Sequence, residues 1–271
     1  MKIRIASFLI ISIAVVVFAI PASSQPLSAP STYNIPRLVN LDPLIRRTFK
    51  SYYVRWYASG PMQELLTEGF YPIGWSRDGK FAFYSEPADE ECGCYFAELV
   101  IMDLRSDKEL YHFKNDPQER LDKDGAPIED DIRKLWKRNE KVFTEKLREH
   151  GIVQIPRFAL MPSRFSAAGK SYAATIAKVR RGDSDDYVRI RKISLDLTSP
   201  TLGKKTLYSA SYTGDDVYSS PLDTAVAGAL KSPYENRVAI VVLNVNRGWE
   251  GPPHTVAVQI AGADLVKGFQ K

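Results

Sequence analysis

Two cysteines separated by one residue form the most reactive pair in this sequence. Cys92 and Cys94 flank Gly93, and the chain contains no other cysteine. In an oxidising compartment they can form a disulfide if the chain turns, because the required Cα spacing of about 5.5 Å is then within reach. Such a small ring would add only about 1.5 kcal/mol on the chain-entropy account, and strain would make it easy to reduce. A structural disulfide, free or intermolecular thiols, and a metal or redox role are all open for this pair.

Carboxylates stand in three separate polar segments of the chain. Glu90, Asp186 and Glu250 belong to these segments, and two carboxyl groups at a suitable separation can hydrolyse a glycosidic bond. Asp183 and Asp185 join Asp186 in a group that could hold Ca²⁺, but the segment lacks the glycine and distal glutamate of a calcium loop. A solvated loop is the simpler interpretation, and no catalytic residue is assigned.

Metal and nucleophile motifs are otherwise weak. The three histidines are scattered, and no pair of His or Cys has zinc-like spacing, so we expect neither a metal nor a cofactor. Gly74, Ser76 and Gly79 are spaced one residue too widely for a nucleophile elbow, which also needs a helix after the turn. Strand-forming residues follow instead, and they favour a structural turn.

The polar segments lie between strand-forming runs, and this arrangement recurs. In residues 70–104 a turn at 76–80 leads into a run of strong β formers, a polar tip and a second β run. The same order occurs in residues 166–208 and, more loosely, in residues 227–260. One such unit cannot bury its apolar face alone. We therefore predict a mainly β protein of antiparallel meander sheets, either propeller-like or stacked.

Two of the predicted strands have informative patterns. Apolar residues change parity within residues 188–197, so a β-bulge near Arg191 and Lys192 is needed to keep a single buried face. Residues 238–243 are apolar throughout. Such a run is typical of a strand that is buried on both faces and central in its sheet.

One long amphipathic helix is predicted over about residues 128–150, inside an insert at residues 116–151. Acidic residues fill its first turn, where the helix dipole favours them, and apolar residues recur at helical spacing up to Gly151. We expect this helix to cover a sheet. A shorter helix is expected to begin at Asp42, with a strand after it that includes Tyr52.

The N-terminus has the pattern of a secretory signal. A charged start, an apolar run and small residues occupy residues 1–24, with a predicted cut before Gln25. An uncleaved anchor is the alternative, but the run is shorter than the ~20 apolar residues of a spanning helix. Residues 25–40 read as a Pro-rich tether and residues 41–271 as a single β-rich domain. We expect a secreted or periplasmic protein with no membrane span after cleavage.

The net charge argues against nucleic acid as a partner. Removal of the signal takes away Lys2 and Arg4, so 37 minus 2 leaves 35 basic residues. Against 32 acidic residues, the formal charge is then +3. Binding to nucleic acid or to an anionic membrane needs a concentrated basic face. The partners that this composition leaves are proteins or envelope components.

The turn of the first unit carries a family resemblance. It is formed by Gly74, Trp75, Ser76, Asp78, Gly79 and Lys80. This turn, with the strand after it, resembles the blades of WD-like β-propellers in bacterial periplasmic proteins. Closure into a ring usually needs four or more blades, whereas two good copies and one looser copy are present.

A second resemblance adds an element near the C-terminus. That element consists of Arg247, Gly248, Trp249, Glu250, Gly251 and Pro252. Together with the first unit it is similar to a family of predicted secreted bacterial proteins of unknown function, which share a Gly-x-Ser-x-Asp-Gly turn and a Gly-aromatic-Glu-Gly-Pro element. The resemblance implies export and assigns no activity.

If the three units are equivalent, their tips at residues 86–94, 181–186 and 246–254 gather at one end, where loops on a rigid scaffold concentrate recognition. Trp249 would be the exposed anchor there, or else it caps the core. We predict a non-catalytic exported binding or envelope-assembly module, with a secreted hydrolase that uses tip carboxylates as the alternative. The candidate binding residues are Trp249, Glu250, His254, Asp183, Asp185, Asp186 and Glu90.

Overall fold

The computed structural model describes residues 32–54, 59–60, 62, 64–88, 94–115, 121–181, 189–213, 218–249 and 252–271. The helical elements are α1 (Asp42–Thr48), the 3₁₀ turn η1 (Lys50–Tyr52) and α2 (Ile132–Glu149). The strands are β1 (Leu66–Thr67), β2 (Gly69–Trp75), β3 (Lys80–Glu86), β4 (Glu98–Asp103), β5 (Lys108–Lys114), β6 (Val153–Gln154), β7 (Arg164–Ala167), β8 (Lys170–Arg181), β9 (Arg189–Ser199), β10 (Gly203–Ser211), β11 (Asp223–Lys231), β12 (Arg237–Asn246) and β13 (Thr255–Asp264). The protein is mainly β, as the sequence predicts.

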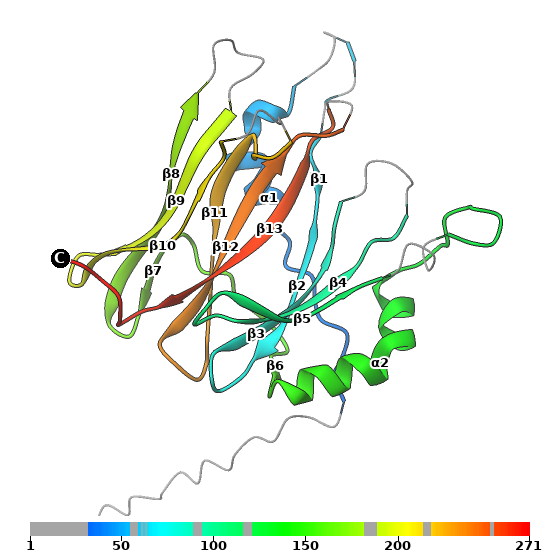
Figure 1. Ribbon diagram of the computed structural model, residues 1–271, viewed down its shortest axis with the longest axis horizontal. Coiled ribbons are helices and arrows are strands. Elements are labelled where there is room, and N and C mark those ends of the chain that lie inside the picture. The colour runs from blue at the N-terminus through cyan, green and yellow to red at the C-terminus, as the bar shows by residue number, and fades with distance from the viewer. Residues whose placement is uncertain are drawn as a thin grey trace, which may run out of the picture.

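The strands form three sheets, each built around an antiparallel meander (Figure 1). Sheet I has the order β5-β4-β3-β2-β6, sheet II the order β10-β9-β8-β7, and sheet III the order β1-β13-β12-β11. Each sheet contains one of the three predicted units. The second strand of each meander begins just after a turn, at Lys80, Lys170 and Arg237. Gly79 and Gly169 take positive φ in two of these turns, a conformation that glycine adopts without steric cost.

Sheet III is the middle layer of the stack. One apolar core packs it against sheet I, through residues such as Val241 and Phe81. A second core packs its other face against sheet II, through residues such as Ile240 and Leu195. Figure 1 shows the same row, with sheet II on the left and sheet I on the right. The sheets are therefore stacked, which is one of the two predicted arrangements.

Two strand predictions are confirmed. β12 lies between β11 and β13, and its apolar residues from Val238 to Leu243 are fully buried. In the pairing of β8 with β9, Val179 faces Lys192 while Arg180 faces Ile190, so Arg191 is the extra residue of a β-bulge. The bulge keeps the buried residues of β9 on one side, because it corrects the change in parity.

The long helix covers the outer face of sheet I, as predicted. It begins at Ile132 rather than near residue 128, because Asp131 is extended and its side chain accepts the Lys134 amide at 2.8 Å as an N-cap. Phe143 and Trp136 on its inner stripe join the core of that face. Within the described residues, no helix has the length and apolar character needed to cross a membrane.

The described part of the predicted tether packs on sheet I. Tyr33 is buried and its hydroxyl donates to the carbonyl of Ile152 at 2.6 Å. The Val39 amide donates to the Phe70 carbonyl at 2.9 Å. Helix α1 begins at Asp42 as predicted, but the strand expected to include Tyr52 is wrong there, because that residue continues the chain in a 3₁₀ turn.

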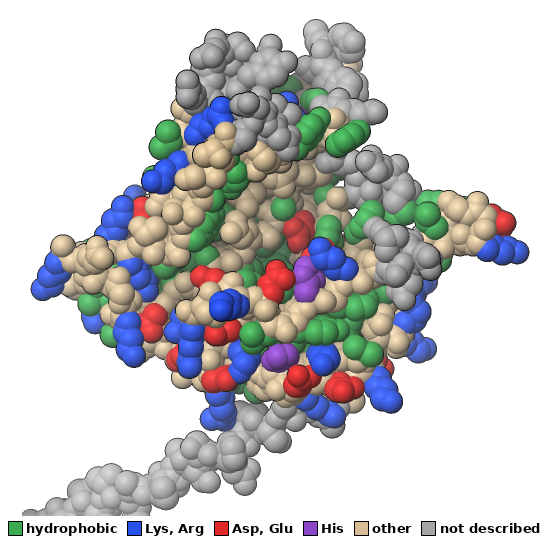
Figure 2. Space-filling view, in the orientation of Figure 1, with side chains coloured by type: hydrophobic (Ala, Val, Ile, Leu, Met, Phe, Trp, Pro, Cys, Tyr) green, Lys and Arg blue, Asp and Glu red, His purple; other side chains and the backbone are tan. Residues whose placement is uncertain are grey.

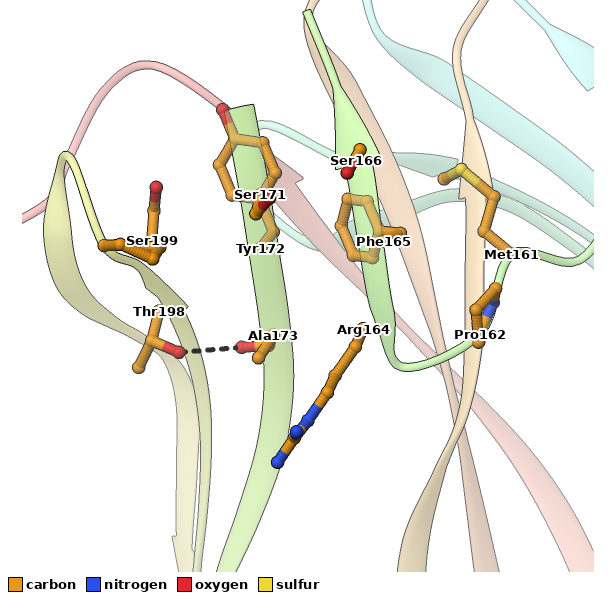
Figure 3. Close-up of a pocket in the computed structure, with 11 residues that line it drawn as sticks. Met161, Pro162, Arg164, Phe165, Ser166, Ser171, Tyr172, Ala173, Thr198 and Ser199 are labelled. Carbon is orange, nitrogen blue, oxygen red and sulfur yellow. Dashed lines mark hydrogen bonds between the residues drawn. The ribbon is translucent and has the colours of Figure 1, made fainter. Parts of the chain in front are cut away.

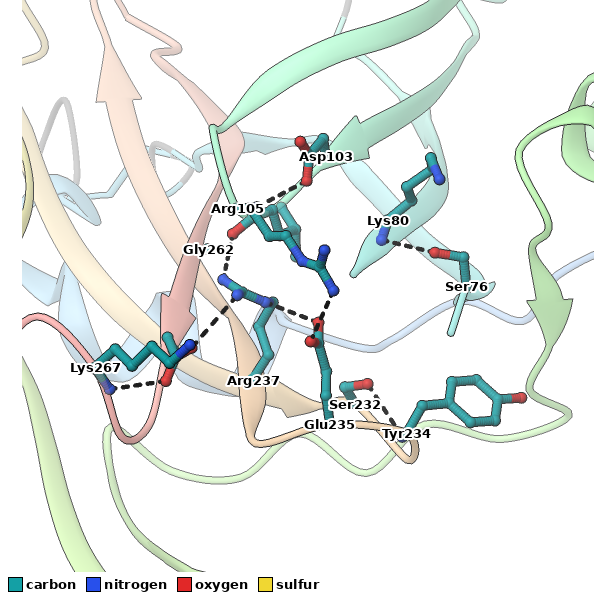
Figure 4. Close-up of polar contacts among 12 residues, drawn as sticks. Ser76, Lys80, Asp103, Arg105, Ser232, Tyr234, Glu235, Arg237, Gly262 and Lys267 are labelled. Atoms are coloured by element: carbon teal, nitrogen blue, oxygen red, sulfur yellow. Dashed lines mark hydrogen bonds and ion pairs between the residues drawn. The ribbon is translucent and has the colours of Figure 1, made fainter. Parts of the chain in front are cut away.

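A polar network joins the turns of sheets I and III (Figure 4). Arg237, which is only 8% exposed, donates from Nη1 to the Leu104 carbonyl at 2.7 Å and from Nε to Glu235 Oε1 at 2.8 Å. Arg105, from the turn between β4 and β5, contacts the same glutamate at 3.3 Å. The network ties together two sheets whose turns are far apart in the sequence.

Candidate functional site

Several predicted site residues lie outside the residues that the structure describes. They are Glu90, Cys92, Asp183, Asp185, Asp186 and Glu250. The Cys92–Cys94 bridge therefore stays a prediction, as do sites that use the tip carboxylates. Trp249 and His254 are described, and both belong to the loop between β12 and β13.

Trp249 projects from the protein rather than capping its core. Its side chain is 67% exposed and stacks on Tyr218, with ring centroids 5.5 Å apart and an interplanar angle of 26°. The Tyr218 hydroxyl donates to the Trp249 carbonyl at 2.8 Å, which holds the two segments together. The pair presents a broad aromatic surface at the end of sheet III.

His254 anchors this loop instead of extending from it. Its Nδ1 accepts the Gly248 amide at 3.2 Å, and its ring packs edge-on against Tyr52 at 6.1 Å between centroids. Burial, with a contribution from the Arg247 charge, lowers the pKa of His254. The neutral imidazole is therefore the form that this loop favours.

Ion pairs join sheet II to sheet III near the Trp249 loop. Lys178 and Arg180 on β8 both contact Asp223 Oδ1 on β11, at 2.6 Å and 2.8 Å. Burial and the Asp223 charge raise the pKa of Tyr52 beside them. We call Tyr218, Trp249, Lys178, Arg180 and Arg247 the tip surface.

The predicted gathering of the tips stays a prediction, because residues 89–93, 182–188 and 250–251 lie outside the described residues. Figure 1 shows the ends of β8 and β9 beside those of β12 and β13, whereas the joined ends of β3 and β4 lie lower and to the side. The tip surface is therefore a feature of sheets II and III.

Ser76 has the structural role expected from its spacing. Its Oγ accepts the Lys80 amide at 2.8 Å, the residue is buried, and β3 follows directly. No helix begins at this turn, so the strand-to-helix geometry of a nucleophile elbow is not present here.

A hollow of about 820 Å³ lies along β7, β8 and the end of β9 (Figure 3). The Thr198 hydroxyl at its margin donates to the Ala173 carbonyl at 3.3 Å. Among its described lining residues, Arg164 is the only charged one. The Tyr172 hydroxyl in its lining could act in acid–base chemistry, but it donates to the Leu265 carbonyl at 2.6 Å, and we assign no chemistry to this hollow.

A second cavity, of about 480 Å³, separates β13 from sheet I. Figure 2 shows acidic and histidine side chains around a hollow in the middle of this face. We call it the inter-sheet cleft. Its lining residues are Glu68, Phe83, Ser85, Pro87, Glu98, Val100, Met102, Asp107, Glu109, His112, Tyr208, Val258, Gln259, Ile260 and Ala261.

Glu68 is the most perturbed carboxyl group of the cleft. It stands between β1 and β2, and its Oε2 accepts the Val258 amide at 2.7 Å. Burial raises the pKa of Glu68 to about 7, although hydrogen bonds from Val258 and Ser85 act in the opposite direction. The nearby charge of Glu98 adds to the increase.

His112 connects two other glutamates of the cleft. Its Nε2 lies 2.8 Å from Glu98 Oε2 and its Nδ1 lies 3.0 Å from Glu109 Oε2. The ring therefore bridges Glu98 and Glu109, and one of its N–H groups donates to at least one of the two carboxylates. Lys114 contacts the other oxygen of Glu98 at 3.1 Å.

Sequence patterns did not point to the cleft. Glu68 lies between β1 and β2, Glu98 begins β4, and His112 lies on β5, and the three share no motif spacing. The one feature that these three residues share in the sequence is that each lies on or next to a strand of sheet I. The stacking of β13 against that unit makes them the walls of a cavity.

Comparisons with known proteins add no assignment. Models of protein families, curated protein sequences and solved structures gave no match to this chain. Within the described residues, no group of three or more His, Cys, Asp or Glu side chains is arranged to hold a metal ion.

Proposed function

We propose that this chain is an exported binding or envelope-assembly module that contacts a protein or envelope component through the tip surface. The observation that carries the proposal is the exposed Trp249–Tyr218 stack. Tryptophan and tyrosine are enriched among the residues that dominate binding energy, because they bury a large rigid area on contact.

Three further observations support the proposal. Residues 1–24 have the pattern of an export signal. The anchoring of the loop by His254 and Tyr52 keeps the aromatic pair in place before binding, which lowers the entropy lost on association. The ion pairs of Lys178 and Arg180 with Asp223 also hold sheet II beside sheet III at this end.

The alternative, a secreted hydrolase with carboxylates on the hairpin tips, has no support among the described residues. Its candidates Glu90, Asp186 and Glu250 all lie outside them. Glycoside hydrolysis depends on the separation of two carboxyl groups, and no such pair is defined at the tips.

The test is a sedimentation assay with isolated bacterial cell envelopes. Because a central aromatic anchor contributes about 2 kcal/mol or more, Trp249→Ala should weaken binding by about tenfold or more, and Trp249→Phe should retain part of it. Val142→Ala, on the exposed face of α2 with 44% exposure, is the control and should bind like wild type. Circular dichroism checks that each variant folds. A folded Trp249→Ala protein that sediments like wild type, or a wild type that does not sediment, rejects the proposal.

A further inference from the structure

Glu68 is a partly buried carboxyl group whose hydrogen-bond partners are all neutral. Those partners are the Val258 amide and the Ser85 hydroxyl. The charged group that affects it most, Glu98, has the same sign. Buried charges in proteins are ordinarily paired with an opposite charge. A cationic group beside Glu68 would supply the missing pairing.

The rest of the cleft is negative as well. With Glu68 included, four carboxylates line it against one imidazole. His112 already bonds to two of them, and Lys114 contacts one of these two, Glu98, at 3.1 Å. The Asp107 carboxylate accepts the Gly262 amide at 2.7 Å at the far end of the cleft. A cation that enters would therefore meet attraction from several sides, in a site partly shielded from water.

The walls between these charges are apolar. Phe83, Val100 and Met102 line the cleft from sheet I, and Val258 and Ile260 line it from β13. Its volume of about 480 Å³ lies within the range of about 300–1,000 Å³ typical of small-molecule sites. The cleft thus has room for an aliphatic chain as well as for a charged head.

The edge of β13 faces the same space. β1 pairs only with Thr255 and Val256 of this strand, and beyond them no described strand pairs with that edge. Backbone carbonyls on an open edge accept hydrogen bonds from N–H donors. An ammonium or guanidinium group has several such donors and no acceptor.

We propose that the inter-sheet cleft binds an organic cation, a primary amine or guanidinium carried on an aliphatic stem. The head lies between Glu68 and the His112-linked glutamates, and the stem packs on the apolar walls. A metal ion is a poorer occupant, because the described acidic and histidine residues form no group suited to one. This site is separate from the tip surface, and it goes beyond the binding role proposed for that surface.

Two sources could supply the cation, a free small amine or the Lys or Arg side chain of a peptide. Isothermal titration calorimetry at pH 8 separates them with pentylamine as one ligand and acetyl-Ala-Lys-Ala-amide as the other. We expect saturable binding of at least one. The matched neutral ligand 1-pentanol has the same stem without the charge, and its binding should be at least tenfold weaker than that of pentylamine or undetectable.

Glu68→Gln is the decisive variant. Its side-chain carbonyl can still accept the Val258 amide, so the fold is retained, but the charge is lost. Binding should weaken by about tenfold or more, since a charged hydrogen-bond partner is lost. Glu140→Gln, at an exposed position on α2, makes the same chemical change away from the cleft and should bind like wild type. Glu109→Gln, at the rim with a side chain 55% exposed, should weaken binding only two- to threefold.

The pH profile gives a second readout that a purely structural role would not change. Binding to wild type should weaken several-fold between pH 8 and pH 6, because Glu68 gains a proton in this range. Glu68→Gln should lose most of this pH dependence.

Other polar and titratable groups also face the cleft. They are Ser85 and Glu98 from sheet I, the Val258 amide from β13, Tyr208 from β10, and Asp107, Glu109 and His112 around β5.

Three results would overturn the proposal: no binding of either cation, equal binding by Glu68→Gln and wild type, or equal affinity for 1-pentanol and pentylamine. Trp249→Ala should bind the amines like wild type. Loss of envelope binding with retained amine binding would therefore separate the tip surface from the cleft.

Discussion

At the scale of single residues, Glu68 shows how position changes chemistry. The carboxyl group is placed by a two-residue strand pairing, and its hydrogen bond to Val258 continues that pairing where β1 ends. Because burial favours the neutral form of a carboxyl group, the pKa of Glu68 rises to about 7. Glu68 therefore changes charge near neutral pH, whereas most carboxyl groups are already ionised above about pH 5.

This shift makes stability depend on pH in a defined direction. Below the ordinary pKa of about 4.5 Glu68 is protonated in both the folded and the unfolded chain and contributes no difference. As the pH rises toward 7 the unfolded chain ionises first, so the free energy of unfolding decreases. Relative to wild type, Glu68→Gln should have an unchanged free energy of unfolding at pH 4 and one about 3 kcal/mol higher at pH 8, since a shift from 4.5 to about 7 is worth about 1.4 kcal/mol per unit. Urea denaturation at both pH values measures this, and a difference that is the same at both would contradict it.

At the scale of elements, α2 is held by its packing rather than by its intrinsic helix propensity. Phe143 is fully buried, with ring centroids 5.0 Å from Phe113 on β5 and 5.2 Å from Trp136. An amphipathic helix gains most of its stability from such a face. The helix is therefore a structural cover of sheet I, and its charged outer side is solvated.

Phe143→Ala should lower the free energy of unfolding by about 3–5 kcal/mol, because it removes a buried ring and leaves a cavity. The adjacent Val142→Ala changes an exposed side chain on the same helix and should stay within about 0.5 kcal/mol of wild type. Chemical denaturation followed by circular dichroism compares the two. Similar losses for both variants would mean that α2 does not pack on sheet I as described.

At the scale of the whole molecule, Arg237 fastens the middle sheet to sheet I. Its guanidinium contacts Glu235 at 2.8 Å and Asp264 at 3.6 Å, and it also satisfies the Leu104 carbonyl. Removing one partner of a buried network leaves the others unpaired, which costs more than the network itself contributes. The joint between sheets I and III therefore depends strongly on this residue.

Arg237→Met retains much of the aliphatic volume and should destabilise the fold by about 3–5 kcal/mol. Arg105→Met is the matched control: its side chain is 52% exposed and pairs with the same glutamate at 3.3 Å, so the loss should be below about 1 kcal/mol. Urea unfolding followed by tryptophan fluorescence measures both. Equal effects of the two substitutions would contradict the role assigned to Arg237.

Much of the fold was predictable because its signals are local. Residue parity along a strand and periodicity along a helix depend on neighbours in the chain, and so the bulge at Arg191, the buried β12 and the helix ending before Gly151 could be predicted from short stretches. Trp249 was identified as a candidate from its Gly-rich setting, but only its surroundings decided between exposure and burial.

The order of the layers and the inter-sheet cleft were decided by tertiary structure. The apolar faces of the three sheets are chemically alike, so nothing in their patterns says that the last sheet in the sequence lies between the other two. Glu68 and Val258 are 190 positions apart, and their contact exists only because that stacking places β13 against the first unit. Local sequence thus determined which strands and helices form, and long-range packing determined which of their side chains meet.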